Sequence, residues 1–415
     1  MMPDIREQVR AWIRDHWHAD LPLGEWRRLL LDSGWAAPSW PAEWFGRALP
    51  PAADAIVGEE LARVGAVGPP LGAGVGLAAP TLLAHGSDHL KRTLLAPILT
   101  GEHTWCQLFS EPGSGSDLAG LTTRAERDGD EWVVNGQKLW STSAHHADFG
   151  MLLARTDWDV PKHFGITYFV LPMQQPGVEA RPLRQMNGHA SFNEVFLDDA
   201  RVPDVNVVGT AGDGWRVALS TLAHERGFAT MRRRRVDAGG GRALREAAAE
   251  AEAYFATYSW YPQRAGRPDL VGDVAAATGR NRDTVARQRI AAVVSRQRAH
   301  DWTARRAQAA RAAGRSPGPE GSLGKLGASE VARSAASTHS LLAGAAGTLT
   351  GGDGLLDGVV AEILTSVPAQ SIAGGTDEIQ RNIIGERVLG LPKEPSVDRD
   401  VRFRDVPRNA TRPEP

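Results

Sequence analysis

One stretch near the C-terminus decides how this chain is interpreted: Ser371-Ile372-Ala373-Gly374-Gly375-Thr376-Asp377-Glu378-Ile379-Gln380-Arg381-Asn382. A second stretch, rich in small residues and hydroxyls, is Phe109-Ser110-Glu111-Pro112-Gly113-Ser114-Gly115-Ser116-Asp117-Leu118-Ala119-Gly120. Glycine and serine favour turns for conformational reasons, so either stretch alone predicts only a loop. Two shorter motifs lie between them: Asn135-Gly136-Gln137-Lys138, whose Asn-Gly pair predicts a tight hairpin turn, and Trp140-Ser141-Thr142.

In this order and at these separations, the motifs resemble those of the acyl-CoA dehydrogenases. With Gly385-Glu386-Arg387-Val388-Leu389-Gly390 the resemblance covers roughly residues 5 to 392. It implies an α+β multidomain fold with an N-terminal helical domain, a middle β-barrel or sandwich domain and a C-terminal four-helix bundle. It also implies FAD, bound where the β domain meets the C-terminal helices and partly covered by a second subunit. A homodimer or tetramer is therefore expected.

The spacing of apolar residues changes twice along the chain, which is how we divide it into domains. Helical spacing comes first, in Ile5–Trp17, Glu25–Ser33, Ala52–Val64 and Ala78–Leu83. Short alternating runs typical of strands follow, in Glu131–Val134, Met151–Arg155, Ile166–Leu171 and Glu194–Leu197. Long alanine- and arginine-rich helical stretches then return. The predicted domains are an N-terminal helical domain at 1–101, a middle β domain at 102–205, a C-terminal helical domain at 206–392, and a flexible tail or partner-docking strand at 393–415.

Composition narrows the partners and the compartment. A net charge of −2 and a pI near 6.7 give no reason to expect nucleic acid or an anionic membrane as a partner. The single cysteine, Cys106, suits a reducing cytosol and predicts no internal disulfide, and no cysteine–histidine cluster predicts a metal site. The N-terminus lacks the apolar core of a signal peptide, and the most apolar stretch, 62–83, is interrupted by an arginine and prolines. We expect a cytoplasmic protein with no membrane span.

Six of the thirteen tryptophans lie before residue 45. Clustered aromatic residues more often form a core than a ligand surface. We interpret these six as packing between the N-terminal helices.

The chemistry of the family makes a demand on this chain. An acyl thioester loses a proton from its α carbon while a hydride leaves the β carbon for the flavin. The proton is too weakly acidic for a solvated carboxylate, so the base needs a water-poor pocket, and the developing oxyanion needs preorganised donors. Gly374 stands where many members keep their catalytic glutamate. The resemblance implies that its backbone N–H still serves the oxyanion, together with a flavin ribityl hydroxyl.

The predicted base is Glu225. Some family members with glycine or alanine in the loop carry their glutamate on a C-terminal-domain helix directly before an arginine, and Glu225-Arg226 matches that place. Glu225 also interrupts an apolar run from Val217 to Phe228, and burying a carboxylate there costs several kcal/mol unless it is compensated. Two alternatives stay open: Glu225 is a structural ion-pair partner of Arg226, or the adjacent His224 is the base, although neighbouring helix residues diverge by about 100°. Arg226 is expected to orient the carboxylate or to support the flavin loop, and it is counted among the substrate-binding residues.

The flavin and substrate contacts follow from the resemblance alone. Gly351-Gly352 resembles the segment that reaches the adenine half of a neighbouring subunit's flavin, although Thr348 stands where glutamine is common. Ser116 is expected to contact both flavin and substrate. The expected cofactor-binding residues are Phe109, Ser110, Ser116, Trp140, Thr142, Gly351, Gly352, Thr376 and Glu378.

The sequence thus predicts an FAD-dependent dehydrogenase that converts an acyl-CoA thioester to the trans-2-enoyl thioester, with an electron-transferring flavoprotein as acceptor. The stretch from Pro317 to Lys325 resembles actinobacterial members, some of which handle steroid side chains. Two alternatives stay open: a flavoenzyme of the same fold that oxidises or hydroxylates a specialised, carrier-bound metabolite, and a partner subunit of a hetero-oligomeric dehydrogenase.

Overall fold

The computed structural model describes residues 4–228, 240–257, 262–312, 318, 320–396 and 398–407. These residues group into two compact units. The first unit comprises the described parts of Met1–Leu183, Ala190–Ser259 and Ser396–Pro415, and the second those of Arg184–His189 and Trp260–Pro395. Each unit is described by itself.

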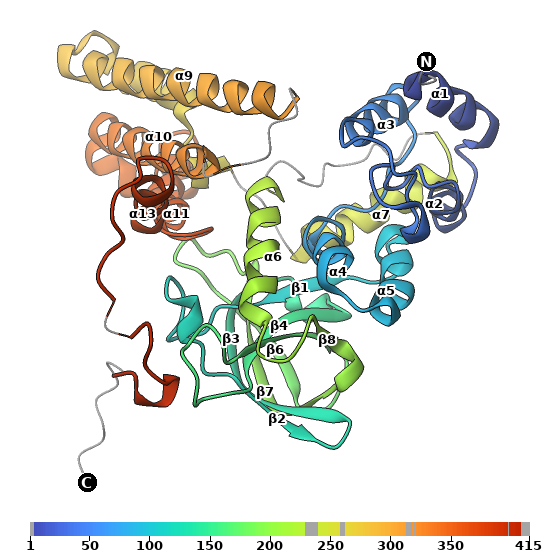
Figure 1. Cartoon of the computed structure of the whole chain (residues 1–415). Coiled ribbons are helices and arrows are strands. Elements are labelled where there is room, and N and C mark those ends of the chain that lie inside the picture. Colours follow the sequence, from blue (N-terminus) through green and yellow to red (C-terminus); the bar gives the residue numbers. More distant parts are fainter. Residues whose placement is uncertain are drawn as a thin grey trace. The chain divides into compact units, whose positions relative to one another are not determined.

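The N-terminal part of the first unit is helical, as predicted. Its helices, blue to cyan in Figure 1, are α1 (Ile5–His16), α2 (Leu23–Asp32), α3 (Ala52–Arg63), α4 (Ala79–His85) and α5 (Asp88–Thr100). Asp4 caps α1 and Ser87 caps α5, each by accepting a backbone N–H of the first turn. Trp26 is fully buried, and the rings of Trp12 and Trp17 pack on it with centroids 5.4 and 4.7 Å away. The tryptophan cluster is therefore a core, as expected.

Two later helices also belong to the first unit, α6 (Gly214–Phe228) and α7 (Arg242–Thr257). Helix α7 packs beside α2 (Figure 1), where Arg27 donates to Glu250 at 2.6 Å and the Leu23 N–H donates to Glu246 at 2.7 Å. The predicted domain boundaries place both helices in the C-terminal domain, whereas they pack in the first unit here. Grouping by packing is not the same as a domain boundary along the chain, so the boundaries stay a prediction.

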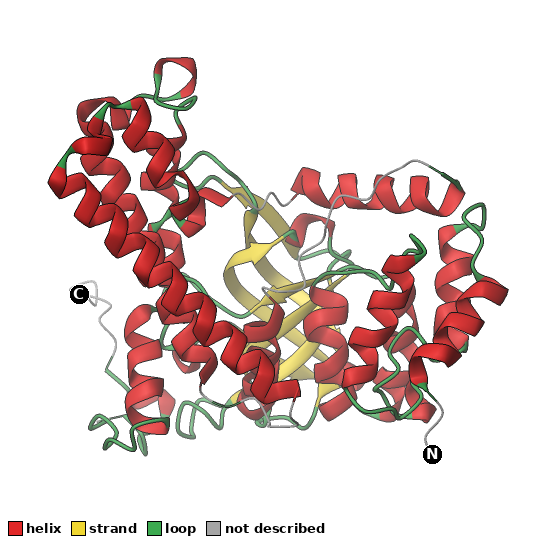
Figure 2. Ribbon diagram, turned by 90° about the horizontal axis from the view of Figure 1, so that it is seen from above, coloured by secondary structure: helices red, strands yellow, loops and turns green. Residues whose placement is uncertain are grey.

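The middle of the first unit is a sheet, yellow in Figure 2. Its strands are β1 (Trp105–Leu108), β2 (Arg124–Asp128), β3 (Glu131–Thr142), β4 (Phe149–Arg155), β5 (Ile166–Pro172), β6 (Val178–Leu183), β7 (Phe192–Pro203) and β8 (Val207–Val208). They run in the order β6-β7-β3-β2-β4-β5-β8, with β1 parallel to β4. Side chains alternate between two cores: Met151 and Leu153 join the core shared with α4, α5 and α6, and Leu152 and Ala154 join the core formed with β3 and β7.

The hairpin predicted at Asn135-Gly136 is wrong. Both residues lie inside β3, at a register shift opposite β7, and the strands β2 and β3 turn instead at Gly129-Asp130. Asn135 exchanges two hydrogen bonds with Asp199 on β7, both 2.9 Å long. A side chain at position 136 would meet Thr123 at 2.5 Å, so the glycine serves a close backbone approach rather than a turn.

The second unit is helical, as predicted for the C-terminal region. It contains α8 (Val271–Ala277), α9 (Thr284–Ala312), α10 (Glu320–Ala343), α11 (Val359–Ser366), α12 (Pro368–Ile372) and α13 (Asp377–Arg387). Helix α10 contacts each of the other five and buries Val331, Ala332, Ala335 and Ala336 at helical spacing. Within the described ranges, no helix is long and apolar enough to cross a membrane.

The C-terminal residues differ from the flexible tail that we expected. Residues 398–407 pack on the first unit, where Phe403 is only 3% exposed. The ring of Phe403 packs against that of Trp158, with centroids 5.4 Å apart.

Candidate active site

The stretch Phe109–Gly120, here called the signature loop, begins at a buried ion pair. The carboxylate of Glu111 accepts from Lys138 Nζ at 2.8 Å and from the backbone N–H groups of Thr122 and Thr123 at 2.7 and 2.8 Å. Burial alone would raise the pKa of Glu111, but Lys138 and the other donors outweigh burial and lower that pKa to about 2. Desolvation lowers the pKa of Lys138, which Glu111 only partly offsets. Both charges therefore depend on each other.

The end of the signature loop is held by Arg155, which the sequence analysis did not identify. This arginine is completely buried, and its guanidinium donates to the carbonyl oxygens of Ala119 and Leu121 at 2.7 and 3.1 Å. An arginine at the end of the apolar run Met151–Arg155 was the available signal. A buried guanidinium satisfies several carbonyl groups at once, which fixes the backbone that leaves the loop.

The predicted flavin-contacting residues of this loop take different positions. The side chain of Phe109 is buried edge-on against Tyr168, with centroids 5.8 Å apart. Ser110 is half-buried, and its carbonyl accepts from the Leu139 N–H at 2.8 Å. Ser116 is exposed at the loop tip. Ser110 and Ser116 thus offer hydroxyls near the surface, whereas Phe109 contributes packing.

Trp140 has the properties of a surface that a planar ring can stack on. Its backbone is left-handed, with φ of 63°, at a register shift between β3 and β7, a strained conformation that often marks a functional position. Its indole is 51% exposed and packs edge-on against Phe192, with ring centroids 5.8 Å apart. The neighbouring Thr142 is half-buried, and the buried Ser141 Oγ has no hydrogen-bond partner among the described residues. An exposed indole face next to a hydroxyl without a hydrogen-bond partner among the described residues suits the binding of a flavin ring.

The predicted base, Glu225, lies on α6, which runs along the sheet (Figure 1). This helix buries Val217, Ala218 and Thr221 and leaves its other side exposed, so it is less buried than the apolar run indicated. Glu225 is half-buried and accepts a 3.4 Å hydrogen bond from Gln107 Nε2.

Of the two residues that flank Glu225 on α6, only His224 has a described side chain. Desolvation lowers the pKa of His224, although its side chain remains largely exposed. The side chain of Arg226 lies outside the described residues. The partner of Glu225, Gln107, lies on β1, two residues before the signature loop. This residue was not identified from the sequence.

In the second unit, the stretch 371–376 forms a glycine turn that leads into α13. Gly374 and Gly375 have φ of 67° and 82°, values that favour glycine. Among the described residues, no atom lies within 4 Å of the place that a Cβ at Gly374 would take, whereas a Cβ at Gly375 would lie 2.6 Å from the Gln380 side chain. Thr376 caps α13 by accepting from the Ile379 N–H. The Thr376 hydroxyl oxygen accepts this bond and keeps its O–H as a donor.

This turn is anchored by a second buried carboxylate. Asp377 is 1% exposed and pairs with Lys325 at 2.9 Å and Arg333 at 3.3 Å, both from α10. Burial alone would raise the pKa of Asp377, but the bonds from Lys325 and its neighbours lower it. Lys325 also donates to the Ser371 carbonyl at 3.2 Å. Lys325 was noticed only as part of a subgroup motif, and its partner Asp377 was missed.

The remaining predicted contacts are exposed. Gly351 and Gly352 form an exposed 3₁₀ turn, and a Cβ at either position would have no atom of the described residues within 4 Å. Glu378 is 78% exposed and pairs loosely with Arg381 at 3.6 Å. Both places offer free surface to a ligand within the second unit.

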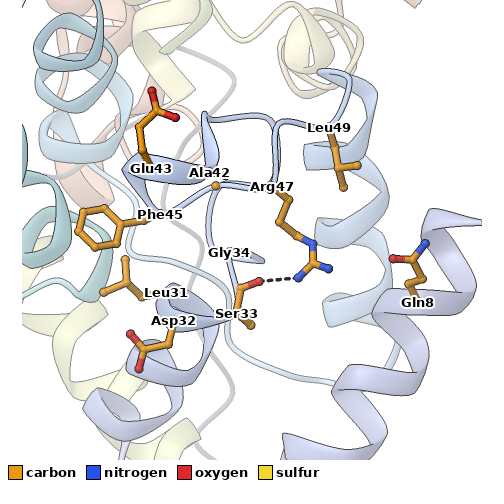
Figure 3. Close-up of a pocket in the computed structure, with 11 residues that line it drawn as sticks. Gln8, Leu31, Asp32, Ser33, Gly34, Ala42, Glu43, Phe45, Arg47 and Leu49 are labelled. Carbon is orange, nitrogen blue, oxygen red and sulfur yellow. Dashed lines mark hydrogen bonds between the residues drawn. The ribbon is translucent and has the colours of Figure 1, made fainter.

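A pocket of about 610 Å³ lies among the N-terminal helices of the first unit. Figure 3 shows Arg47 beside it, donating to the Ser33 carbonyl, with Glu43 and Asp32 on the other side. None of the predicted site residues lines it. The candidate site therefore rests on the motifs and their anchors, not on this pocket.

Three protein-family models match the chain, and they match in order. The models describe the N-terminal, middle and C-terminal domains of acyl-CoA dehydrogenases and cover residues 4–102, 106–200 and 275–389. The fold and the site motifs are those of a flavin-dependent oxidoreductase, and the chain belongs to the acyl-CoA dehydrogenase family.

Relatives and solved structures agree. The acyl-CoA dehydrogenase IpdE1 of Mycobacterium tuberculosis is 36% identical over 94% of this chain and 98% of its own length. FadE34 of the same organism is 37% identical, and this chain spans about half its length, 49%. The Tcur3481-Tcur3483 steroid ACAD matches with a TM-score of 0.65 and 26% identity over 94% of this chain and 97% of that one. The ChsE4-ChsE5 complex of M. tuberculosis matches with a TM-score of 0.63 and 28% identity over the same shares.

Proposed function

We propose that this protein dehydrogenates an acyl-CoA thioester between its α and β carbons, with Glu225 as the base that takes the α proton. One observation carries the assignment. The Glu225 carboxylate is half-buried and hydrogen-bonded to Gln107, on the strand that leads directly into the signature loop. A carboxylate in this setting is oriented and partly shielded from water, as a general base requires.

In the proposed reaction, residues of this chain take up the α proton and stabilise the developing oxyanion. Glu225 removes the α proton, and Gln107 orients the carboxylate that receives it. By resemblance to the family, the backbone N–H of Gly374 stabilises the developing thioester oxyanion, a role that no side-chain change at this position removes. FAD, when bound, accepts the hydride from the β carbon.

The residues present fit FAD in the first unit, where Trp140 offers an exposed indole face. We propose that Trp140 and Thr142 bind the isoalloxazine and that Ser110 and Ser116 bind the flavin through their hydroxyls. Phe109 supports the loop from the core. In the second unit, Gly351, Gly352, Thr376 and Glu378 are proposed to contact the cofactor, as in the family.

The substrate and partners follow from the relatives. Because similar structures are a steroid ACAD and the two-chain ChsE4-ChsE5 complex, we propose a thioester with a bulky, steroid-type acyl group. The assembly is proposed to be a homodimer or tetramer, or a hetero-oligomer with a homologous subunit. Ser116 and Arg226 are proposed to contact the thioester, and an electron-transferring flavoprotein in the cytoplasm is the proposed acceptor.

The replacement Glu225→Gln tests the base. Glutamine keeps the size and the contact to Gln107 but cannot take a proton, so flavin bleaching by a reactive acyl-CoA should slow by about 10²- to 10⁴-fold. The neighbouring His224→Gln serves as the matched control and should bleach at the wild-type rate. If Glu225→Gln still bleaches its flavin and His224→Gln does not, His224 is the base instead of Glu225.

A second replacement asks whether position 374 addresses the same carbon. A Cβ at Gly374 has no described atom within 4 Å, and a glutamate there costs about 1–2 kcal/mol for its left-handed backbone. Gly374→Glu in the Glu225→Gln background should restore part of the bleaching rate. If a variant that still binds FAD shows no recovery, positions 225 and 374 do not reach the same substrate carbon.

A further inference from the structure

The structure assigns a function to the C-terminal segment 398–407, here called the strap: we infer that it positions the signature loop through Lys162 and Arg155. The strap, both side chains and the loop all lie in the first unit.

The strap is docked by its backbone as well as by side chains. The Phe403 N–H donates to the Val160 carbonyl at 2.9 Å, and the Arg404 N–H donates to the Trp158 carbonyl at 3.1 Å. Arg404 also pairs with Asp159 at 2.5 Å. The strap therefore follows the connection between β4 and β5, with an isolated antiparallel bridge between Arg402 and Pro161 followed by a 3₁₀ turn at Phe403–Asp405.

Lys162 links the strap to the tip of the signature loop. Its ammonium donates to Asp398 in the strap at 2.7 Å and to Asp117 in the loop at 2.9 Å. The Lys162 side chain is 13% exposed, and that of Asp398 is 21% exposed. Desolvation alone would lower the pKa of Lys162, but its bonds to the two aspartates outweigh desolvation and raise it. One ammonium thus holds the strap and the residue next to Ser116.

Arg155 forms the second link. The ring of Phe403 lies 3.4 Å from the Arg155 guanidinium carbon, and this guanidinium holds the carbonyls of Ala119 and Leu121 and, at 3.1 Å, that of Lys162. Stacking an aromatic face on a guanidinium shields its hydrogen bonds from water. The strap therefore covers the group that fixes the end of the loop.

The two links meet the loop on either side of Leu118. Without the strap, Lys162 would lose Asp398, the less exposed of the two aspartates that it pairs with, and the Arg155 guanidinium would lose the Phe403 ring that packs on it. We therefore assign the strap as a positioning element for Ser116 and the flanking backbone. The consequence for flavin and thioester binding rests on the proposed function, whereas the order of the loop does not.

Hydrogen–deuterium exchange on the full chain tests the loop directly. Asp398→Asn removes the charge that holds Lys162, and Phe403→Leu removes the aromatic face while keeping an apolar side chain. Each should raise the exchange rate of the peptide spanning 112–121 by about tenfold, as expected for the loss of one charge-assisted contact. The matched control is Arg399→Gln, an exposed strap residue, which should leave exchange unchanged. Exchange unchanged in both test variants would overturn the proposal.

A second experiment removes the strap and returns it. The chain shortened after Pro395 should lose FAD about tenfold more readily, and a synthetic peptide of residues 396–407 should restore retention when added in excess. A shortened chain with wild-type exchange at 112–121 refutes the positioning role. Faster exchange with unchanged FAD retention supports the strap and counts instead against the proposed flavin contacts of Ser116.

Discussion

Replacing Glu111 by glutamine should destabilise the protein and change how its stability depends on pH. Glutamine keeps the size of the side chain but leaves the Lys138 ammonium, which is completely buried, without a counter-charge. Breaking a buried ion pair in this way costs about 3–5 kcal/mol. The pKa of Glu111 gives a similar figure: it falls from 4.5 to about 2 on folding, and a pKa difference of one corresponds to about 1.4 kcal/mol, hence about 3 kcal/mol.

The sign of the pH dependence follows from the direction of that change. A carboxyl whose folded pKa is lowered contributes stability above its unfolded pKa, and this contribution is lost as pH falls towards the folded pKa. Urea denaturation of wild type and Glu111→Gln should therefore differ by about 3 kcal/mol at pH 7. The difference should narrow by about 1–1.5 kcal/mol by pH 3.5.

The control for this prediction is Glu126→Gln, which changes a 64%-exposed carboxylate on the same sheet and should cost less than about 0.5 kcal/mol at any pH. Adding Lys138→Met to Glu111→Gln should recover part of the loss, because the double variant no longer buries an unpaired charge. Equal stability of wild type and Glu111→Gln at pH 7, or a difference that does not narrow in acid, would refute the reasoning.

Two further replacements test the other contacts. Gln107→Leu should lower kcat by about 10-fold, because the amide that orients the carboxylate of the proposed base Glu225 is lost; an unchanged kcat contradicts this role of Gln107. Lys325→Met leaves the buried Asp377 carboxylate without the closer of its two cationic partners, so proteolysis near residues 371–376 should accelerate by about 10-fold or more, while Lys393→Met, an exposed change, should have no effect. Cleavage at the wild-type rate in Lys325→Met would show that Lys325 does not anchor this turn.

The sequence predicted the order of helical and β regions well, because each type of element has its own spacing of apolar residues. The helix predicted at Ile5–Trp17 is α1, and the run Ile166–Leu171 is β5. The Asn-Gly pair failed because the same two residues serve either a two-residue turn or a close approach between strands. Only the neighbour at Thr123 decides between these uses, and it is 13 positions away from Gly136 in the chain.

For the site, the sequence identified the loops but not what holds them. The motif residues Ser116, Trp140 and Gly374 do lie on loops or strained strand positions, which local glycine and serine patterns can indicate. Their anchors depend on pairings between distant positions, such as Lys162 with Asp398, 236 residues apart. No local pattern encodes such a pairing, because a lysine in a loop and an aspartate in a charged tail look alike whether or not they meet.

The anchoring also explains how a glycine at position 374 is compatible with an intact loop. The signature loop is held by Glu111 and Lys138, and the turn at 371–376 is held by Asp377 and Lys325, each pair buried within its own unit. Neither anchor uses the side chain at 374, and a backbone N–H there needs none. If the base is Glu225 on α6, as proposed, position 374 needs no functional side chain. Glycine is then the residue that best adopts the φ of 67° found there.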